Sequence, residues 1–304
     1  MRYVLEYPSE LPAASAEFLE PEVVRAVAEQ AEAAGFSAVA LSEHPAPSLK
    51  WRRGGGHNTL DPIAALSFMA AATSRIRLLT NLYVLPFHNP YLAAKALGSL
   101  DLLSRGRLIA GVGAGYLRSE FSAVGVAHER RAELFDEALA ALRGIWTEPE
   151  QPVTGKDFGG VSAMWLQRPV QRPHPPIWIG GNGAAARRRV VEHGSGWMPI
   201  IADATMAAAM RTTAIETPEA FGAAVLALRR RTEAAGRDPA AIDIQVVCPP
   251  MDFADPGTVR AAREYLSDLE QRGATWAVVH ADGTGPAAAN EFIRTFGSTV
   301  IANR

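Results

Sequence analysis

A glycine-rich turn near the middle of the chain has the composition of an anion-binding site. It consists of Gly180, Gly181, Asn182 and Gly183, and it precedes a segment of helical spacing that begins near Ala184. Free N–H groups and the positive end of the dipole meet at the start of a helix, and the dipole alone favours an anion there by about 0.3–1 kcal/mol. The turn therefore predicts a phosphate-bearing cofactor, and we expect one or two of residues Arg187–Arg189 to face the anion. The alternative is that these glycines only shape a turn and the arginines form a solvated face.

A second glycine cluster follows a short apolar run. Leu108–Val112 is too short for a helix and is bounded by glycines, which predicts a strand buried on both faces. Glycines then alternate at 111, 113 and 115, and positions without a side chain let a flat ligand approach the backbone closely. A tight strand-to-loop turn without a ligand would show the same pattern. Because α/β proteins bind ligands at the carboxyl ends of their strands, we expect a binding site here.

Several other kinds of catalytic site have no signature in the sequence. Neither His-x-His nor His-Glu-x-x-His occurs among the seven histidines, so we predict no metal site. There is no Gly-x-Ser-x-Gly elbow, no Walker loop and no Gly-x-Gly-x-x-Gly dinucleotide fingerprint. His44, which follows the apolar run Phe36–Leu41, is the candidate proton donor, because an imidazole titrates near neutral pH. The alternative for His44 is a packed residue that only supports the site.

Hydrophobic patterning predicts the elements that position these residues. Eight apolar runs alternate with eight segments of helical spacing, which is typical of a (β/α)8 TIM barrel with its site at the carboxyl ends of the strands. Residues 147–176 lack periodicity and are predicted to form an insertion. The predicted strands cover residues 3–7, 36–41, 76–85, 108–112, 177–179, 196–199, 242–247 and 276–280. The predicted helices cover residues 21–34, 61–72, 91–103, 129–146, 184–192, 218–235, 259–271 and 286–296.

The bulk composition argues against several classes of partner. Of 304 residues 48% are hydrophobic, the formal net charge is −2 and the pI is about 6.4. This balance indicates neither a nucleic-acid partner nor an acidic membrane surface, and no apolar window is long enough to span a bilayer. No signal peptide is visible, and the single cysteine, Cys248, excludes an internal disulfide. We therefore expect a cytoplasmic protein in which Cys248 is a buried structural thiol.

In combination, the motifs resemble the bacterial luciferase-like monooxygenase superfamily, and within it the F420-dependent oxidoreductase branch. The resemblance extends over nearly the whole chain up to about residue 200 and is weaker beyond it. The matching stretches are Leu41–His44, Thr73–Thr80, Val84–Pro86, Asn89–Pro90, Leu97–Phe121, Arg130–Trp146, Pro175–Asn182 and His193–Trp197.

The resemblance implies one luciferase-like TIM-barrel domain over residues 1–304, forming a homodimer that acts on a small organic substrate. The ring of F420 or FMN would lie across the strand ends, with its phosphate at Gly180 and Gly181. A cis non-prolyl peptide is implied at Asn81-Leu82, and His44 would support the cofactor or the reacting carbon as the catalytic residue. The implied cofactor-binding residues are Asn81, Leu82, Gly113, Gly115, Tyr116, Gly180, Gly181, Asn182 and Gly183.

One departure from the family pattern argues against a sugar-phosphate substrate. Sugar-phosphate dehydrogenases of this branch carry a catalytic Glu in the loop after the fourth strand, and Gly113–Gly115 contains none. Glu120 lies nearby and is expected to anchor the loop. The leading hypothesis is hydride transfer between F420 and an unidentified small organic substrate. The alternatives are an FMN-dependent monooxygenase, which uses reduced flavin, and a non-catalytic flavin-binding protein. Residues 46–59, with three successive glycines, are either a mobile lid or a disordered loop.

Overall fold

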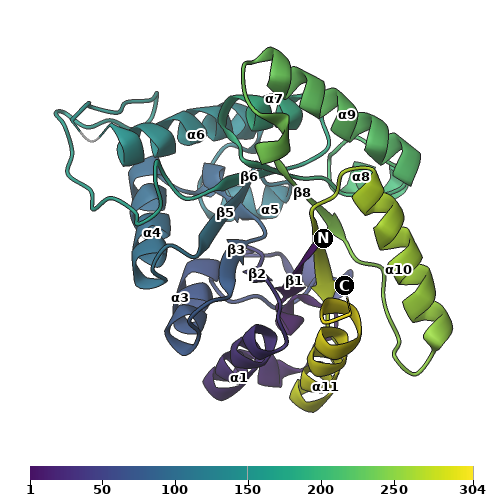
Figure 1. Cartoon of the computed structure of the whole chain (residues 1–304). Coiled ribbons are helices and arrows are strands. Elements are labelled where there is room, and N and C mark those ends of the chain that lie inside the picture. Colours follow the sequence, from purple (N-terminus) through teal and green to yellow (C-terminus); the bar gives the residue numbers. More distant parts are fainter. Residues whose placement is uncertain (149, 304) are drawn as a thin grey trace.

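Parallel strands form a closed barrel that is surrounded by helices (Figure 1). The computed structural model describes residues 1–148 and 150–303. The strands are β1 (Arg2–Glu6), β2 (Ala38–Leu41), β3 (Arg77–Thr80), β4 (Tyr83–Val84), β5 (Leu108–Gly113), β6 (Ile177–Gly180), β7 (Gly196–Met198), β8 (Asp243–Val247) and β9 (Trp276–His280). They follow the order β3-β2-β1-β9-β8-β7-β6-β5-β4, and an additional β3–β5 pairing closes the sheet. Because β3 and β4 share one position, the strands fill the eight positions of the predicted TIM barrel.

The eight predicted helices are confirmed with small shifts at their ends. They are α1 (Pro21–Ala33), α3 (Pro62–Ala72), α4 (Pro90–Leu103), α6 (Arg131–Thr147), α7 (Ala184–His193), α9 (Pro218–Ala234), α10 (Pro256–Gln271) and α11 (Pro286–Phe296). Local chemistry sets several starts: Asp61 Oδ1 accepts a hydrogen bond from Ala64 N, and Thr217 Oγ1 accepts one from Ala220 N. Shorter helices that patterning did not predict lie in the connections: α2 (Leu49–Arg53), α5 (Arg118–Ala123) and α8 (Ala204–Ala209).

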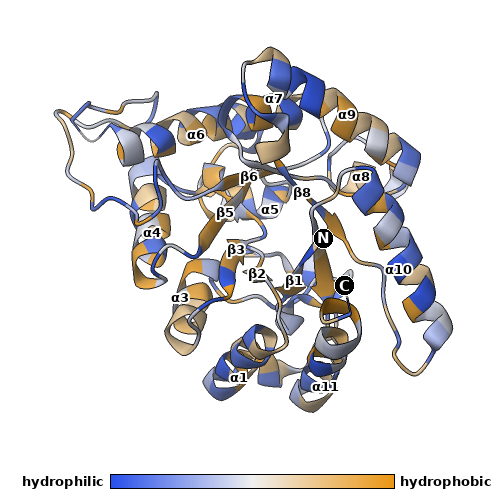
Figure 2. Ribbon diagram, in the orientation of Figure 1, coloured by the Kyte–Doolittle hydropathy of each residue, from blue (hydrophilic) through white to orange (hydrophobic). Residues whose placement is uncertain are grey.

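Apolar side chains form two layers on either side of the strands. One layer fills the barrel interior, where the Trp178 and Trp276 rings meet edge to face at 5.1 Å. The larger layer packs the outer faces of the strands against the helices and includes the buried Cys248 thiol. Figure 2 shows the strands as predominantly hydrophobic, whereas the surrounding helices carry hydrophilic residues as well. Strands buried on both faces are expected for a parallel barrel.

The third barrel strand differs from its prediction. Residues 76–85 were expected to form one continuous strand, but a cis peptide at Asn81-Leu82 interrupts it between β3 and β4. The continuous strand was therefore wrong, while the cis peptide that the family resemblance implied at this position is confirmed. Downstream, the helix expected to begin at residue 129 begins at Arg131, after a 3-10 turn at His128–Arg130.

The predicted insertion is the long connection between α6 and β6. Its described residues contain only an isolated antiparallel bridge between Thr154 and Gly159. Its end is tied to α4, because Asp101 Oδ2 accepts hydrogen bonds from the backbone N–H groups of Val170 and Gln171 at 2.6 and 3.0 Å. The insertion therefore ends at a defined place on the outer layer of the barrel.

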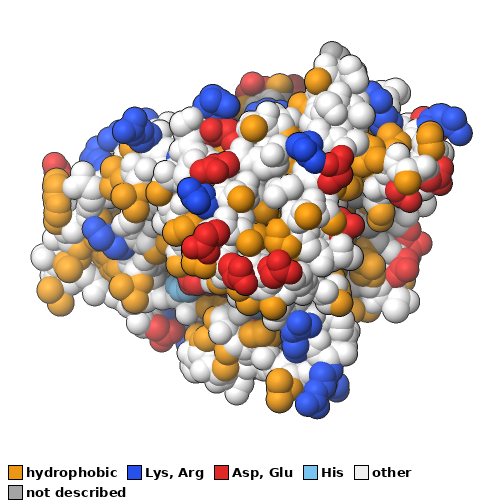
Figure 3. All heavy atoms as spheres, turned by 90° about the horizontal axis from the view of Figure 1, so that it is seen from below, with side chains coloured by type: hydrophobic (Ala, Val, Ile, Leu, Met, Phe, Trp, Pro, Cys, Tyr) orange, Lys and Arg blue, Asp and Glu red, His pale blue; other side chains and the backbone are white. Residues whose placement is uncertain are grey.

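The surface agrees with the nearly balanced charge. Figure 3 shows acidic and basic side chains interspersed with apolar ones on the face seen from below, with acidic side chains gathered near its middle. Among the described residues, no helix combines the length and the apolar character that crossing a bilayer requires.

Candidate functional site

A histidine and a glutamate from distant parts of the chain meet at the carboxyl mouth of the barrel, the end where the parallel strands terminate. His44 follows β2, and its Nδ1 lies 3.3 and 3.2 Å from the two carboxylate oxygens of Glu120 in α5. The Glu120 side chain is buried, and 10% of the His44 side chain is exposed. A carboxylate accepts hydrogen bonds, so this contact places a proton on Nδ1 of His44 and leaves Nε2 as the end that can act on a ligand. Glu120 was expected to anchor its loop, and the structure adds a direct contact with His44.

Residues 46–59, here called the cap segment, fold over His44. The Trp51 ring from α2 lies 4.5 Å from the His44 ring, and the His57 ring lies 5.2 Å from it. Tyr116 approaches from the opposite loop, with its ring 6.4 Å from His44 and perpendicular to it. Burial raises the pKa of the Tyr116 hydroxyl. The cap segment and Tyr116 therefore enclose the imidazole in aromatic rings.

Glu43, the neighbour of His44, has a structural role. Its carboxylate accepts a hydrogen bond from Val84 N at 2.5 Å and lies 2.7 Å from His88 Nε2. The His88 ring in turn stacks on Tyr83 at 4.2 Å. Glu43 thereby fixes β4 directly after the cis peptide, which positions the wall of the mouth.

The cis peptide presents Asn81 to a polar network across the mouth. Asn81 Nδ2 donates to Glu6 Oε1 at 2.9 Å, and the other Glu6 oxygen lies 3.0 Å from His280 Nε2. This bond to Glu6 raises the pKa of His280. Gln245 Nε2 donates to Asn81 Oδ1 at 3.4 Å, while the buried Gln245 Oε1 has no hydrogen-bond partner among the described residues. The network leaves a polar acceptor within the mouth.

The predicted glycines accommodate side chains of this chain. A Cβ at Gly113 or at Gly180 would lie 2.7 or 2.4 Å from Leu82 Cδ1, so one leucine covers both positions. A Cβ at Gly115 would lie 2.7 Å from Val84, and this residue takes a positive φ of 74° that favours glycine. Leu82 thus forms the apolar floor of the mouth, and a flat ring would rest on Leu82 and not directly on Gly113 or Gly180.

The turn before α7 has the features expected of a phosphate cradle. Gly183 is the N-cap of α7 and provides no side-chain hydrogen bond to the helix, so the first N–H groups lack a side-chain cap. The Thr213 hydroxyl oxygen lies 3.8 Å from the position of a Cβ at Gly183. Amide donors and a hydroxyl suit a phosphate, so the residues present fit such a group.

Asn182 uses its side chain to hold this turn. Its Nδ2 donates to Ile200 O and Thr213 O, each at 2.7 Å, and its Oδ1 accepts from Ile200 N at 2.9 Å. Its backbone N–H donates to Thr212 Oγ1 at 2.8 Å. Asn182 therefore supports the shape of the cradle through bonds to two neighbouring loops.

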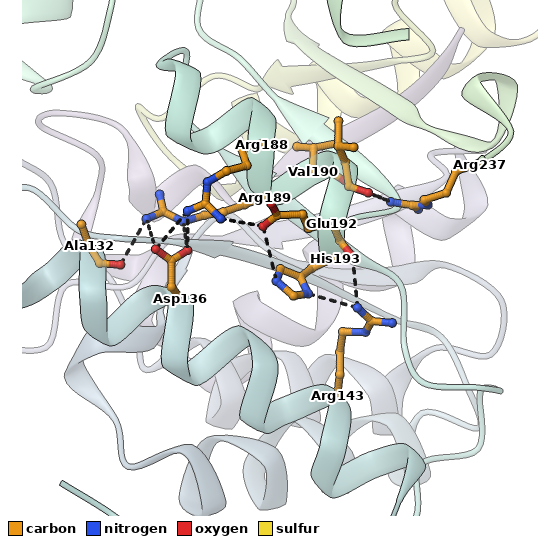
Figure 4. Close-up of polar contacts among 10 residues, drawn as sticks. Ala132, Asp136, Arg143, Arg188, Arg189, Val190, Glu192, His193 and Arg237 are labelled. Atoms are coloured by element: carbon orange, nitrogen blue, oxygen red, sulfur yellow. Dashed lines mark hydrogen bonds and ion pairs between the residues drawn. The ribbon is translucent and has the colours of Figure 1, made fainter. Parts of the chain in front are cut away.

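Two of the arginines expected near the anion are directed elsewhere. Arg188 and Arg189 both pair with Asp136 of α6, with nitrogen–oxygen distances of 3.1 and 2.7 Å (Figure 4). Partial burial would raise the pKa of Asp136, but the two guanidinium groups lower it below its ordinary value. Asp136 engages Arg188 and Arg189, so of the three arginines expected near the anion only Arg187 keeps that prediction.

Other arginines hold the far end of the same helix. Arg237 donates to the carbonyl oxygens of Val190 and Val191, and Arg143 donates to Glu192 O and contacts His193 (Figure 4). These cations satisfy carbonyl groups at the C-terminus of α7, where the dipole favours positive charge. Arginine side chains thus bind the carbonyl groups at the C-terminal end of α7, while its N-cap residue Gly183 provides no side-chain hydrogen bond.

Sequence reasoning missed several residues of the mouth. It did not single out Glu6, Glu10 or Gln245, although the position of Glu6 at the end of the first strand was a signal that could have indicated it. His57 was seen only as part of a loop, because its contact with His44 depends on the folding of the cap segment. Within residues 1–148 and 150–303, no group of three or more His, Cys, Asp and Glu residues could hold a metal ion.

Comparison with known proteins yields relatives with two kinds of cofactor. An uncharacterized protein of Mycobacterium tuberculosis is 37% identical over 142 residues, 46% of this chain and 50% of the relative. The FMNH(2)-dependent dimethylsulfone monooxygenase of Pseudomonas putida is 32% identical over 54% of this chain and 44% of its own length. The F420-dependent glucose-6-phosphate dehydrogenase of Intrasporangium calvum is 33% identical over 61% and 55%.

The chain spans about half the length of the curated relatives it matches. The fold is also that of the monooxygenase RslO1 from Streptomyces bottropensis, with a TM-score of 0.80 and 22% identity over 100% of this chain and 99% of that one. The family model described as luciferase-like monooxygenase matches residues 7–291. The chain therefore belongs to the luciferase-like monooxygenase family.

Proposed function

We propose that this protein is an oxidoreductase that transfers a hydride between the deazaflavin F420 and a small organic substrate. The observation that carries the proposal is the His44–Glu120 pair, which directs an imidazole nitrogen into the carboxyl mouth of the barrel. Hydride transfer to or from a carbon–heteroatom bond is accompanied by a proton, and this pair can hold one. When bound, the cofactor supplies the hydride chemistry.

The cofactor would lie between the floor of the mouth and the start of α7. Its phosphate would accept hydrogen bonds from the N–H groups that follow Gly183, within the turn formed by Gly180, Gly181 and Asn182. Its ring would rest on Leu82, beside Asn81 and Tyr116, with Gly113 and Gly115 giving Leu82 and the loop the room they need. In this arrangement His44 Nε2 holds or receives the substrate proton, while Glu120 keeps the imidazole oriented.

An FMN-dependent monooxygenase that uses reduced flavin is the second candidate. A relative whose name includes FMNH(2) is 32% identical to this chain over 168 residues. F420 is preferred because relatives named as F420-dependent are 30–33% identical over longer stretches, of 189 to 196 residues. The phosphate cradle and the apolar floor suit either cofactor.

A side-by-side titration of the purified protein with F420 and FMN, followed by fluorescence, tests the proposal. We expect F420 to bind in the micromolar range and FMN to bind much more weakly. The reverse preference would favour the oxygen-activating monooxygenase, and binding of neither would overturn the cofactor assignment. The titration is followed by a screen of carbonyl, imine and alkene substrates with reduced F420.

Two variants separate catalysis from binding in that screen. His44→Ala should abolish turnover while F420 affinity is largely retained. His193→Ala is a matched control, because His193 lies at the far end of α7 against Arg143. Cofactor binding with no turnover of any substrate by the wild-type protein would instead support a non-catalytic flavin-binding protein.

A homodimer is also part of the proposal. Large apolar side chains on α3 and α4 are exposed to solvent, with 45% of Phe68 and 68% each of Leu92 and Leu103 accessible. Exposed apolar groups of this kind are common at protein–protein interfaces. Sedimentation at several concentrations tests this, and a concentration-independent monomer would contradict it.

A further inference from the structure

A second imidazole–carboxylate pair lies next to His44. In the cap segment, His57 Nδ1 is 3.8 Å from Oε2 of Glu10, which ends the 3-10 turn η1 (Pro8–Glu10). Glu10 is buried, and its carboxylate accepts hydrogen bonds from Ser42 N at 3.1 Å and from the Thr59 hydroxyl at 2.8 Å. The carboxylate is therefore held in place from both sides of the cap segment.

Successive contacts connect the two pairs. Glu120 contacts His44, the His44 and His57 rings meet edge to face at 5.2 Å, and His57 reaches Glu10. His44 Nδ1 faces the Glu120 carboxylate, whereas His57 Nδ1 contacts Asn58 O at 3.3 Å and lies 3.8 Å from Glu10 Oε2, so in both rings Nε2 is the end available for exchange. At this separation the two imidazoles are in direct contact. His57 is the more accessible ring, with 17% of its side chain exposed against 10% for His44.

We propose that His57 and Glu10 form a second acid–base pair that exchanges the proton of the reaction with His44. The inference rests on the proposed function, because it assigns the route by which the catalytic imidazole recovers its proton. His57 and Glu10 act through His44 and are positioning residues for proton transfer. They give the enclosed site a proton path that does not require the cap segment to open.

In the reducing direction, the bound cofactor would supply a hydride, with its two electrons, to a substrate carbon, and the carbon–heteroatom double bond would become a single bond. The substrate heteroatom takes the proton from His44 Nε2, which leaves His44 neutral. His57 then passes its proton to His44, and solvent restores the proton on His57. In the oxidative direction each transfer runs in reverse.

Burial and neighbouring groups shift the pKa of both members of the pair. Burial lowers the pKa of His57, the hydrogen bond to Asn58 O and the charge of Glu6 raise it, and the positive charges of His44 and Arg52 lower it further. Burial and the nearby Glu6 raise the pKa of Glu10 to about 7. Trp51, which packs against both imidazoles, is uncharged.

Imidazole titrations by NMR test the pair without any substrate or cofactor. We would follow His57 in the ¹⁵N-histidine-labelled full chain. Loss of a positive charge 5.2 Å away in His44→Gln should raise the His57 midpoint by about 0.5–2 pH units. Glu10→Gln keeps one of the two oxygens that accept from Ser42 N and the Thr59 hydroxyl, and it should lower the midpoint by about half a unit or more. His193→Gln is the control and should leave it unchanged.

An unchanged His57 midpoint in both His44→Gln and Glu10→Gln would overturn the proposal. Kinetics then separate a proton path from structural support. In the reaction found with reduced F420, His57→Gln should lower kcat about 10- to 100-fold with little change in KM, and added imidazole should partly restore it. A raised KM without rescue by imidazole would also overturn the proposal. Failure to bind F420 would refute the proposed function, whereas the titration judges the pair independently.

Discussion

Replacing Gly111 by alanine is expected to destabilise the barrel where its sheet closes. The added Cβ would lie 2.0 Å from the backbone oxygen of Thr80, with Leu79 Cδ1 at 3.1 Å and Met198 Sδ at 3.2 Å. Side-chain atoms can rotate away, but Thr80 O belongs to β3, which pairs with β5. Relief therefore requires the two strands to separate by about 1 Å or more, because carbon and oxygen atoms do not approach much below van der Waals contact.

The expected loss of folding free energy is large because a backbone atom must move. Overpacking that is relieved by side-chain movement costs about 1–3 kcal/mol, so Gly111→Ala, which displaces backbone, should cost about 3 kcal/mol or more. This is a large part of the roughly 5–15 kcal/mol by which domains are stable. The strain would also disturb the bond from Thr80 Oγ1 to Gly111 O, directly before the cis peptide.

Urea unfolding followed by tryptophan fluorescence and circular dichroism measures this effect. Gly98→Ala is the matched control, because Gly98 lies within α4 and a Cβ there meets nothing closer than 3.6 Å. That control should stabilise the protein by about 0.5–1 kcal/mol, since alanine favours a helix over glycine. A free energy of unfolding for Gly111→Ala within about 0.5 kcal/mol of wild type would refute the steric reasoning.

Three further predictions concern charged and reactive groups. Glu120→Gln should lower kcat about 10- to 150-fold at unchanged F420 affinity, since a hydrogen bond to a charged group contributes about 1.5–3 kcal/mol; an unaltered kcat would contradict the role of the pair. Burial raises the pKa of Glu10 from 4.5 to about 7, so its protonated form favours the folded state. That contribution, up to about 3 kcal/mol, is complete below pH 4.5 and is lost as the pH rises through about 7, and Glu10→Gln should remove this pH dependence from urea unfolding. Burial raises the pKa of Cys248 to about 12, so a thiol reagent should label it slowly in the native protein and rapidly in urea; rapid native labelling would show that the thiol is accessible.

Much of the fold could be predicted from local patterns. The run Leu108–Val112 gave a strand because it is apolar, short and bounded by glycines, and β5 covers Leu108–Gly113. Pro286 and Phe296 bound α11 where helical spacing placed it. The break at Asn81-Leu82 was different, because nothing in the hydrophobic pattern of residues 76–85 indicates it. It was anticipated only from the resemblance to the family.

The candidate site was predictable in its position and less so in its contacts. His44 and Gly180–Gly183 follow strands, and parallel strands of a barrel end at one mouth, so their placement followed from the fold class. Whether Arg189 faces the turn or Asp136 depends on how α6 packs on α7. The sequence does not indicate how far apart these two helices lie. Leu82 was expected to touch a cofactor, but its filling of the space beside Gly113 and Gly180 required the coordinates of three strands.

The sequence by itself determined the elements, because strand and helix formation depend on apolar spacing, capping side chains and glycine positions within a few residues. It also determined that Cys248 is buried, since it lies in a strand-like apolar run. Only the tertiary structure decided which charges meet. His44 and Glu120 are 76 residues apart, and His57 and Glu10 are brought together when the cap segment folds over the first turn. Electrostatic and hydrogen-bond energies depend on separations of a few ångströms, and barrel closure sets those separations for residues distant in the chain.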